Sequence, residues 1–170
     1  MARVPLITTK DGLDAEQAAV FDWLLESRGK MLRPFEVLLH QPVLARGTGE
    51  LGSTIRFATS IPDADRELAI LATGRAHGCQ YVWDSHLPNA EAAGVRPEAI
   101  TALADGSGGF TKNEAALVEL VDQLRQTSSV SDELFGMLQE TYGTTGVIEL
   151  TMTIGYYTML GYTMSACGAC

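Results

Sequence analysis

Residues 67–94 read ELAILATGRAHGCQYVWDSHLPNAEAAG and gather most of the chain's reactive side chains into one short stretch. Two of the protein's three histidines lie here, one of them His86, together with Glu67, Cys79 and Trp83. Carboxylate, imidazole and thiol groups are the usual carriers of acid–base and nucleophilic chemistry. We therefore look for a functional site in this stretch and interpret the remaining sequence mainly as scaffold.

The stretch predicts two helices joined by a turn. Residues Glu67 to Ala76 are mostly good helix formers, and Gly74 and Gly78 frame the end of the run, because glycine costs about 1 kcal/mol relative to alanine inside a helix. A chain reversal at Gly78 would place Glu67 and His86 at similar heights on facing helices, given a rise of about 1.5 Å per residue. The sequence therefore predicts contact between a carboxylate and an imidazole.

The second of these helices is expected to carry Cys79, Val82 and His86 on one face, with Trp83 close to it. Cys79 would occupy the first turn, where backbone N–H groups and the helix dipole favour a thiolate. Ordinary structural roles are also open: a packed, hydrogen-bonded core residue for His86, a first-turn charge for Glu67, and a small buried apolar residue for Cys79.

The string from Glu67 to Val95 resembles the core motif of the carboxymuconolactone decarboxylase and alkylhydroperoxidase D superfamily. In the redox branch, that motif is a glutamate, a Cys-x-x-Cys pair and a histidine four residues after the second cysteine. Glu67, Cys79 and His86 match the glutamate, the first cysteine and the histidine, whereas Val82 replaces the second cysteine. Many decarboxylase-like members have a glutamate at that place, so the valine departs from both branches. The strings PFEVLLHQPVLA and IELTMTIGYYTMLGYTM extend the resemblance over roughly residues 30–166.

This resemblance implies an all-α, alkylhydroperoxidase D-like helical bundle that assembles as a homo-oligomer, trimeric or hexameric. It also implies a cofactor-free lyase or isomerase acting on a small, anionic carboxylated lactone or related unsaturated acid. His86 would donate a proton and Glu67 would orient it, while an arginine would grip the substrate carboxylate in a bidentate manner. The candidate substrate-binding residues are Arg56, Arg75, His40 and Trp83.

Two other functions are compatible with the same residues. One is a peroxidase or disulfide reductase that uses Cys79, with a tail cysteine as second thiol only if the C-terminus folds back over the site. The other is a non-catalytic small-molecule-binding member of the fold. The tail sequence CGAC at 167–170 is interpreted as incidental, because chain ends tend to fray and the second ligand pair of a zinc site is missing. No metal site is predicted, since Glu67 and His86 form at most part of a ligand set.

Composition and net charge indicate which kinds of binding partner and which cellular compartment to expect for the protein. A net charge of −9 and a pI near 4.7 argue against nucleic acid and anionic membranes, which both require clustered Lys and Arg. A single domain over residues 1–170 is expected, with 1–12 as an extended N-terminal arm. The N-terminus lacks an apolar signal segment and three cysteines suit a reducing compartment, so we expect a cytoplasmic protein.

The rest of the sequence predicts helices, and the expected fold class is all-α. Asp14 is a plausible N-cap, residues 111–114 (TKNE) form a capping box, and GSGGF at 106–110 is a turn rather than a phosphate loop. The run at 146–166 is long enough for a membrane span, but Glu149, its threonines and two glycines favour a helix buried within the subunit and at an interface. His77, next to the helix break, could equally be a site residue or a surface residue. Three tyrosines are interpreted as packing residues, namely Tyr81, Tyr156 and Tyr157. The segment around the prolines at 34 and 42 is interpreted as a linker that holds at most one or two helical turns. Helices are expected at 13–28 and 43–59, then from Pro62 as the first helical residue to 76, and at 79–93, 97–105, 111–126, 131–143 and 146–166.

Overall fold

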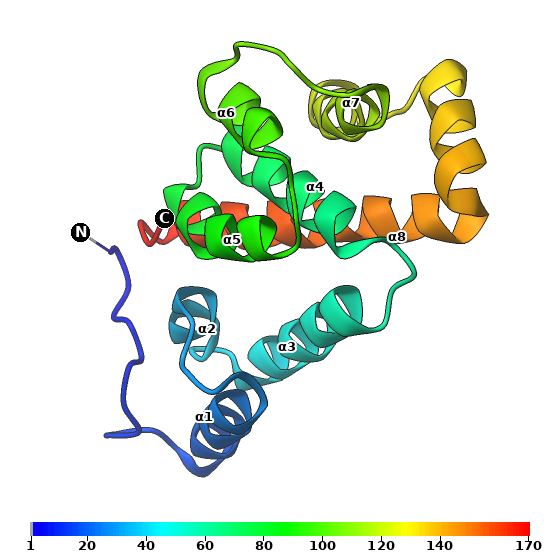
Figure 1. The fold of residues 1–170 in the computed structure, drawn as a ribbon. Coiled ribbons are helices and arrows are strands. Elements are labelled where there is room, and N and C mark those ends of the chain that lie inside the picture. The colour runs from blue at the N-terminus through cyan, green and yellow to red at the C-terminus, as the bar shows by residue number, and fades with distance from the viewer. Residues whose placement is uncertain (1) are drawn as a thin grey trace. The chain divides into compact units, whose positions relative to one another are not determined.

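The computed structural model describes residues 2–170, and every regular element in that part of the chain is a helix (Figure 1). The predicted all-α class is therefore confirmed, whereas the homo-oligomer stays a prediction. The helices are α1 Ala15–Arg28, α2 Arg33–Leu38, α3 Pro42–Phe57, α4 Asp63–Ala76, α5 Gln80–Ala92, α6 Pro97–Asp105, α7 Lys112–Thr127 and α8 Asp132–Ala166.

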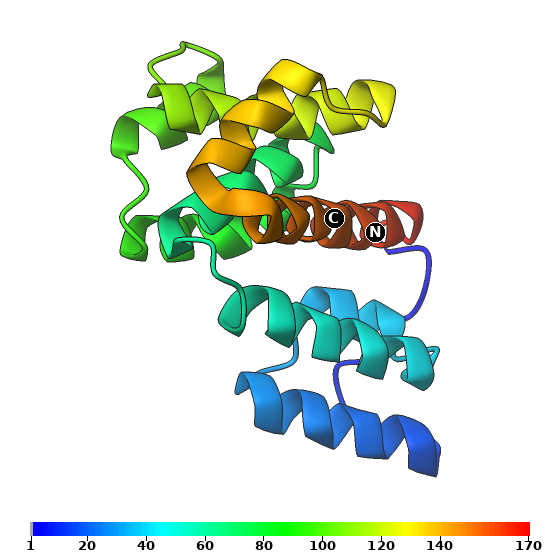
Figure 2. The same cartoon turned by 90° about the vertical axis from the view of Figure 1, so that its right-hand side faces the viewer.

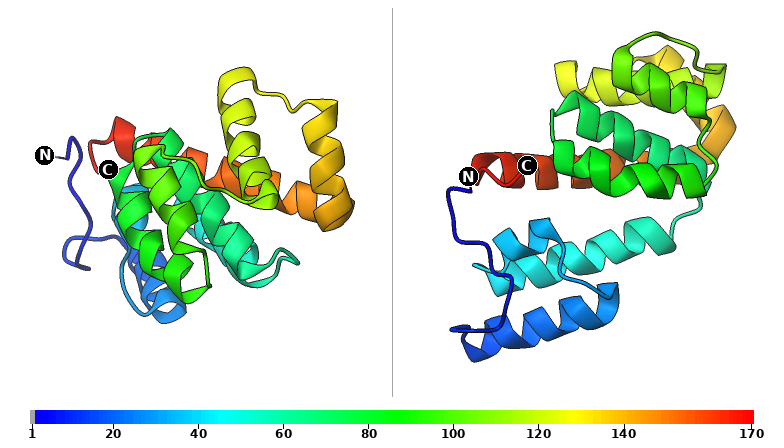
Figure 3. Two further views of the ribbon diagram at one scale, coloured as in Figure 1. Left: turned by 45° about the horizontal axis from the view of Figure 1, so that its top comes forward. Right: turned by 60° about the vertical axis from the view of Figure 1, so that its left-hand side comes forward.

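The helices are divided between two compact units, one formed by residues 2–58 and 162–170 and the other by residues 59–161. In the first unit, α3 packs against both α1 and α2. In the second, α4 is the central helix and packs against α5, α6 and α7 (Figure 3). The single domain predicted for residues 1–170 stays a prediction.

Close helix contact in the first unit depends on a glycine of α3. A Cβ atom at Gly49 would lie only 2.7 Å from the indole of Trp23 on α1, so no larger residue fits without movement. The predicted N-terminal arm has no helix in its described residues, and Met1 lies outside them. Two backbone bonds fix this arm: the Arg3 N–H donates to the carbonyl of Cys167, and the Ile7 N–H to that of Glu36.

Two of the predicted helix starts form complete capping boxes. The Asp14 carboxylate accepts from the backbone N–H of Gln17, whose side chain accepts from the Asp14 N–H in return. Thr111 and Glu114 make the same reciprocal pair at the start of α7. These bonds satisfy backbone donors that have no partner within the helix, so local sequence defines both starts.

The turn between α4 and α5 lies where the glycines predicted it. Gly78 has a φ of +63°, a left-handed conformation that favours glycine, and it follows the last residue of α4 closely. Gly74 allows the two helices to approach, because a Cβ atom there would lie 2.8 Å from Cγ1 of Val82. The start of α4 differs by one residue from expectation, since Pro62 is the N-cap and Asp63 the first helical residue.

The last helix, α8, is bent where two separate helices were predicted. Gly143 has a φ of 66° and a ψ of 176° inside it, a combination that is essentially restricted to glycine. Figure 2 shows the two straight segments of α8 meeting at an angle. Among residues 2–170, none of the helices combines the length and apolar character that crossing a membrane requires.

Candidate functional site

The turn at Gly78 brings Glu67 of α4 and His86 of α5 into direct contact. The imidazole Nδ1 lies 2.8 Å from the carboxylate Oε2. Only 11% of the His86 side chain and 5% of the Glu67 side chain are exposed. The predicted carboxylate–imidazole contact is therefore confirmed, and its burial strengthens the hydrogen bond because little water competes for either group.

This contact determines how the imidazole of His86 can act. A carboxylate accepts hydrogen bonds, so Nδ1 carries a proton and donates it to Glu67. Nε2 has no hydrogen-bond partner within residues 2–170, and it is therefore the nitrogen that can exchange a proton with a bound molecule. The pair has the arrangement of a general acid or base with a carboxylate behind it.

Tyr157 of α8 completes the surroundings of the imidazole. Its ring meets the His86 ring edge to face, with centroids 4.8 Å apart and planes at 86°. Tyr156 packs against Tyr157 in the same manner. Tyr157 was predicted only as a packing residue, because nothing local in the sequence indicates that α8 passes beside His86. Its ring now adds to the constraints on how the imidazole can rotate.

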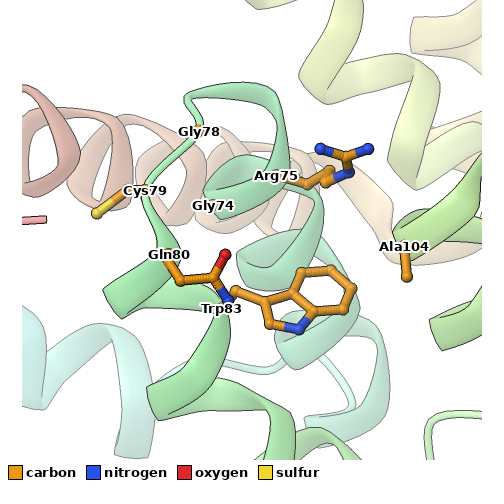
Figure 4. Close-up of a pocket in the computed structure, with 7 residues that line it drawn as sticks. All are labelled: Gly74, Arg75, Gly78, Cys79, Gln80, Trp83 and Ala104. Atoms are coloured by element: carbon orange, nitrogen blue, oxygen red, sulfur yellow. The ribbon is translucent and has the colours of Figure 1, made fainter.

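A cavity of about 400 Å³ lies beside the α4–α5 turn and is broadly open to solvent (Figure 4). Arg75 and Trp83, both predicted for substrate binding, project into it, and Ala104 of α6 faces them. Neither Glu67 nor His86 lines this cavity. Its lining consists of Gly74, Arg75, Gly78, Cys79, Gln80, Trp83 and Ala104.

Cys79 occupies the N-cap position of α5, just before the first turn in which it was predicted. It is 1% exposed, and Figure 4 shows its sulfur directed away from Arg75 and Trp83. Val82, in the place of the family's second cysteine, is 3% exposed and lies against Gly74 of α4. A valine there fills the helix contact. Cys79 is nevertheless disulfide-bonded, as is Cys170, whereas Cys167 is a free thiol. The tail sequence CGAC, interpreted from the sequence as incidental, therefore contributes a cysteine to a disulfide.

The other two substrate-binding candidates belong to the unit formed by residues 2–58 and 162–170. The Arg56 guanidinium lies over the ring of Phe57, 5.0 Å from its centroid. His40 donates from Nε2 to the carbonyl of Pro5 at 2.7 Å. The role of Arg56, Arg75, His40 and Trp83 in holding a substrate at His86 stays a prediction.

His77, for which the sequence left a surface position open, is partly buried at the end of α4. Its Nε2 lies 3.0 Å from Oγ1 of Thr158 on α8. Burial, and secondarily the positive charge of Arg125, lowers the pKa of His77. Elsewhere in the described chain, no group of three or more His, Cys, Asp or Glu side chains is placed to hold a metal ion.

The sequence of this region matches a known family. Residues 42–123 match the model of the carboxymuconolactone decarboxylase family. This segment belongs to that family. It spans α3 to most of α7, and so it contains both members of the Glu67–His86 pair as well as Cys79. No curated protein gives a detectable match to the chain.

Two solved structures resemble the fold over nearly its whole length. One is an uncharacterized peroxidase-related protein from Silicibacter sp. TM1040, with a TM-score of 0.78, 12% identity, and coverage of 98% of this chain and 90% of that one. The other, from Ralstonia eutropha JMP134, is an uncharacterized peroxidase-related protein described as an alkylhydroperoxidase AhpD core. Its TM-score is 0.80 at 16% identity, with 99% of this chain and 91% of that one covered. At such low identity the likeness shows the fold alone.

Proposed function

We propose that this protein is a cofactor-free lyase or isomerase of the carboxymuconolactone decarboxylase type. Its substrate is a small carboxylated lactone or a related unsaturated acid. The observation that carries the proposal is the buried 2.8 Å bond between Nδ1 of His86 and Glu67, which leaves Nε2 for the substrate. Family membership of residues 42–123 supports the same chemistry.

The decarboxylation requires one proton from the protein. The bond between the substrate carbon and its carboxylate breaks, CO₂ leaves, and the electron pair remains on the substrate as a dienolate-like anion. Doubly protonated His86 gives its Nε2 proton to carbon and becomes a neutral imidazole that still donates from Nδ1 to Glu67. Solvent then returns the Nε2 proton. An isomerase would use the same pair, first removing a proton from carbon and then returning it.

Glu67 acts through His86 in this mechanism. The hydrogen bond that its carboxylate accepts from Nδ1 keeps Nε2 pointed in one direction. A carboxylate that orients a histidine lowers the cost of aligning the proton with the reacting carbon. Glu67 is therefore a positioning residue, and His86 is the group that meets the substrate.

A thiol peroxidase is the alternative that must be distinguished. Attack of a Cys79 thiolate on a peroxide would give a sulfenic acid and release an alcohol, and a thiol would then have to reduce the sulfenic acid. Position 82, where the redox branch of the superfamily has its second cysteine, is a buried valine in this chain. Cys79 is itself disulfide-bonded, so the thiol alternative does not lack a second sulfur. We favour the lyase or isomerase because the Glu67–His86 acid–base pair is intact.

The test is a substrate screen on wild type and Cys79→Ser after treatment with a chelator. Small carboxylated lactones and unsaturated acids are monitored for CO₂ release and for changes in ultraviolet absorption. We expect turnover of at least one compound, retained in Cys79→Ser. Peroxide turnover that needs a dithiol reductant and disappears in Cys79→Ser, without any reaction of the acids, would establish the thiol alternative. Binding without any turnover would instead establish a non-catalytic member.

A further inference from the structure

Beyond the proposed reaction, we propose that the cavity between α4, α5 and α6 is a separate binding site for a small planar carboxylate. The cavity has a volume of about 400 Å³, within the range of about 300–1,000 Å³ found for small-molecule sites. Glu67 and His86 do not line it, so a ligand bound there would not occupy the proposed reaction centre.

Arg75 supplies the anion-binding group of this site. Its Nε donates to the carbonyl of Leu103 in the last turn of α6, at 3.1 Å. This bond fixes the plane of the guanidinium, and the two terminal nitrogens have no partner within residues 2–170. A guanidinium held along one edge can still present N–H groups to both oxygens of a carboxylate, so the ligand's charged end belongs at Arg75.

Trp83 and the small residues around it select the shape of the ligand. Figure 4 shows the Trp83 indole and the Arg75 guanidinium on the same side of the cavity, facing Ala104. Gly74, Gly78 and Ala104 contribute nothing larger than a methyl group, so a flat ring can approach the backbone. Aromatic side chains bind flat apolar groups by stacking. The matching ligand is therefore an aromatic or conjugated carboxylate.

Gln80 adds a neutral polar group at the rim. Its amide nitrogen donates to the carboxylate of Asp84 at 2.8 Å, so its amide oxygen is the atom left to accept a hydrogen bond. The Asp84 carboxylate therefore accepts its hydrogen bond from the Gln80 amide and not from Arg75. A hydroxyl on the ligand ring would suit this oxygen, whereas a second carboxylate would not.

The experiment titrates the Trp23→Phe variant with benzoate, so that Trp83 is the only fluorescent indole. Trp23 lies in the other compact unit, against Arg28 and Arg46. We expect saturable quenching with a dissociation constant on the order of 1 mM, as suits a ligand of this size. Neutral benzamide should bind at least about tenfold more weakly, because it lacks the charge that Arg75 recognises. Calorimetric titration of the wild type gives the same comparison if Trp23→Phe fails to fold.

Three variants decide the assignment. Arg75→Gln should weaken benzoate binding by at least about tenfold, whereas Arg46→Gln, at an exposed arginine in the other unit, should leave it unchanged. His86→Gln should bind benzoate like the wild type, even though the proposed reaction would be lost in it. Absence of saturable benzoate binding in the wild type, or equal affinity in Arg75→Gln, would overturn the site. Loss of binding in His86→Gln would place the ligand at the reaction centre and overturn it as well.

Discussion

The hydrogen bond between Glu67 and His86 determines which nitrogen of the imidazole can meet a substrate. A histidine with Nδ1 committed to a carboxylate has only Nε2 to give or take a proton. The ring of Tyr157 packs nearly perpendicular to the same imidazole, so its rotation is restricted on a second side. At the scale of single residues, the site is therefore a proton-transfer group with one defined direction of approach.

Glu114 provides a pH-dependent test of the local electrostatics. The hydrogen bond from Arg96 is the main cause that lowers the pKa of Glu114 from its ordinary value of 4.5 to about 2. A depressed carboxyl pKa contributes stability that is present above about pH 4.5 and is lost as the pH falls through about 2. Glu114→Gln keeps a residue suited to the capping box but removes the charge. Its stability deficit should therefore be larger at pH 7 than at pH 2.5.

Urea denaturation of wild type and Glu114→Gln at the two pH values measures this deficit. Glu119→Gln is the matched control on the same helix, since within residues 2–170 the Glu119 carboxylate accepts only from the neutral Gln123 amide. The control should shift the midpoint little at either pH. An equal deficit for Glu114→Gln at both pH values would show that its charge does not stabilise the fold.

Single residues also show how far the sequence could predict the site. The Glu67–His86 contact was predictable because helix rise and a glycine turn are local properties of one stretch. The position of Tyr157 was not, because it depends on how α8 packs against α5, a contact between segments far apart in the chain. That Arg75 lines a cavity without His86 was not predictable either, because this cavity also includes Ala104 of α6, which is distant in the chain.

At the scale of helices, the α4–α5 contact depends on the fit of Gly74 to Val82. An added methyl at residue 74 would lie 2.8 Å from Cγ1 of Val82, so Gly74→Ala forces the helices apart. We expect a loss of about 1–2 kcal/mol of unfolding free energy, as overpacking outweighs the better helix propensity of alanine. Turnover should also fall, because the same two helices carry Glu67 and His86.

Val82→Ala makes room for that methyl, which gives a double-mutant cycle. The double variant Gly74→Ala/Val82→Ala should be more stable than the sum of the single effects predicts, by about 1 kcal/mol or more. Denaturant unfolding of the four proteins yields this coupling energy. Strict additivity would mean that the Gly74–Val82 fit does not set the distance between α4 and α5.

The bend in α8 gives a second test at this scale. Alanine at residue 143 would have to adopt a φ of 66° with a ψ of 176°, so Gly143→Ala should destabilise the protein by about 1–3 kcal/mol. Gly136→Ala is the matched control in the same helix, since an added Cβ atom there meets nothing within 4 Å. That control should be neutral or stabilising by up to about 1 kcal/mol. Thermal melts of both variants decide whether the bend needs glycine.

Element boundaries were predictable where local signals were strong and less so elsewhere. Capping boxes at Asp14 and Thr111 and the glycine after α6 define helix ends through backbone bonds that the sequence itself encodes. The start of α4 lies one residue after the predicted one, because Pro62 is the N-cap and not the first helical residue, and proline suits both positions. At Gly143 the expected stop is a sharp bend, after which helix resumes immediately.

At the scale of the whole molecule, exposed apolar side chains on α8 indicate self-association. Ile148, Met152 and Met159 are 59%, 47% and 43% exposed and lie on one face of the helix. Such a stripe is unfavourable in water and suits an interface with a second copy. We predict that light scattering at micromolar concentration gives a multiple of the 18.2 kDa chain mass.

Met152→Lys should shift that assembly toward smaller species, because it places a charge in the proposed interface. Gln126→Lys on α7 is the control, since it adds the same charge at an exposed residue outside this stripe. A wild-type mass near 18.2 kDa would contradict self-association and remove the interface role of the final helix.

The most direct test of the central claim is the turnover of His86→Gln per folded molecule, measured beside its thermal melt. As the proton donor, His86 should account for roughly two to four orders of magnitude in rate, with little change in the melting temperature. Glu67→Gln should lose less, because its amide oxygen can still accept from Nδ1, and His77→Gln should keep wild-type turnover. A His86→Gln variant that is destabilised by about 1–3 kcal/mol yet fully active would show instead that His86 serves only the fold.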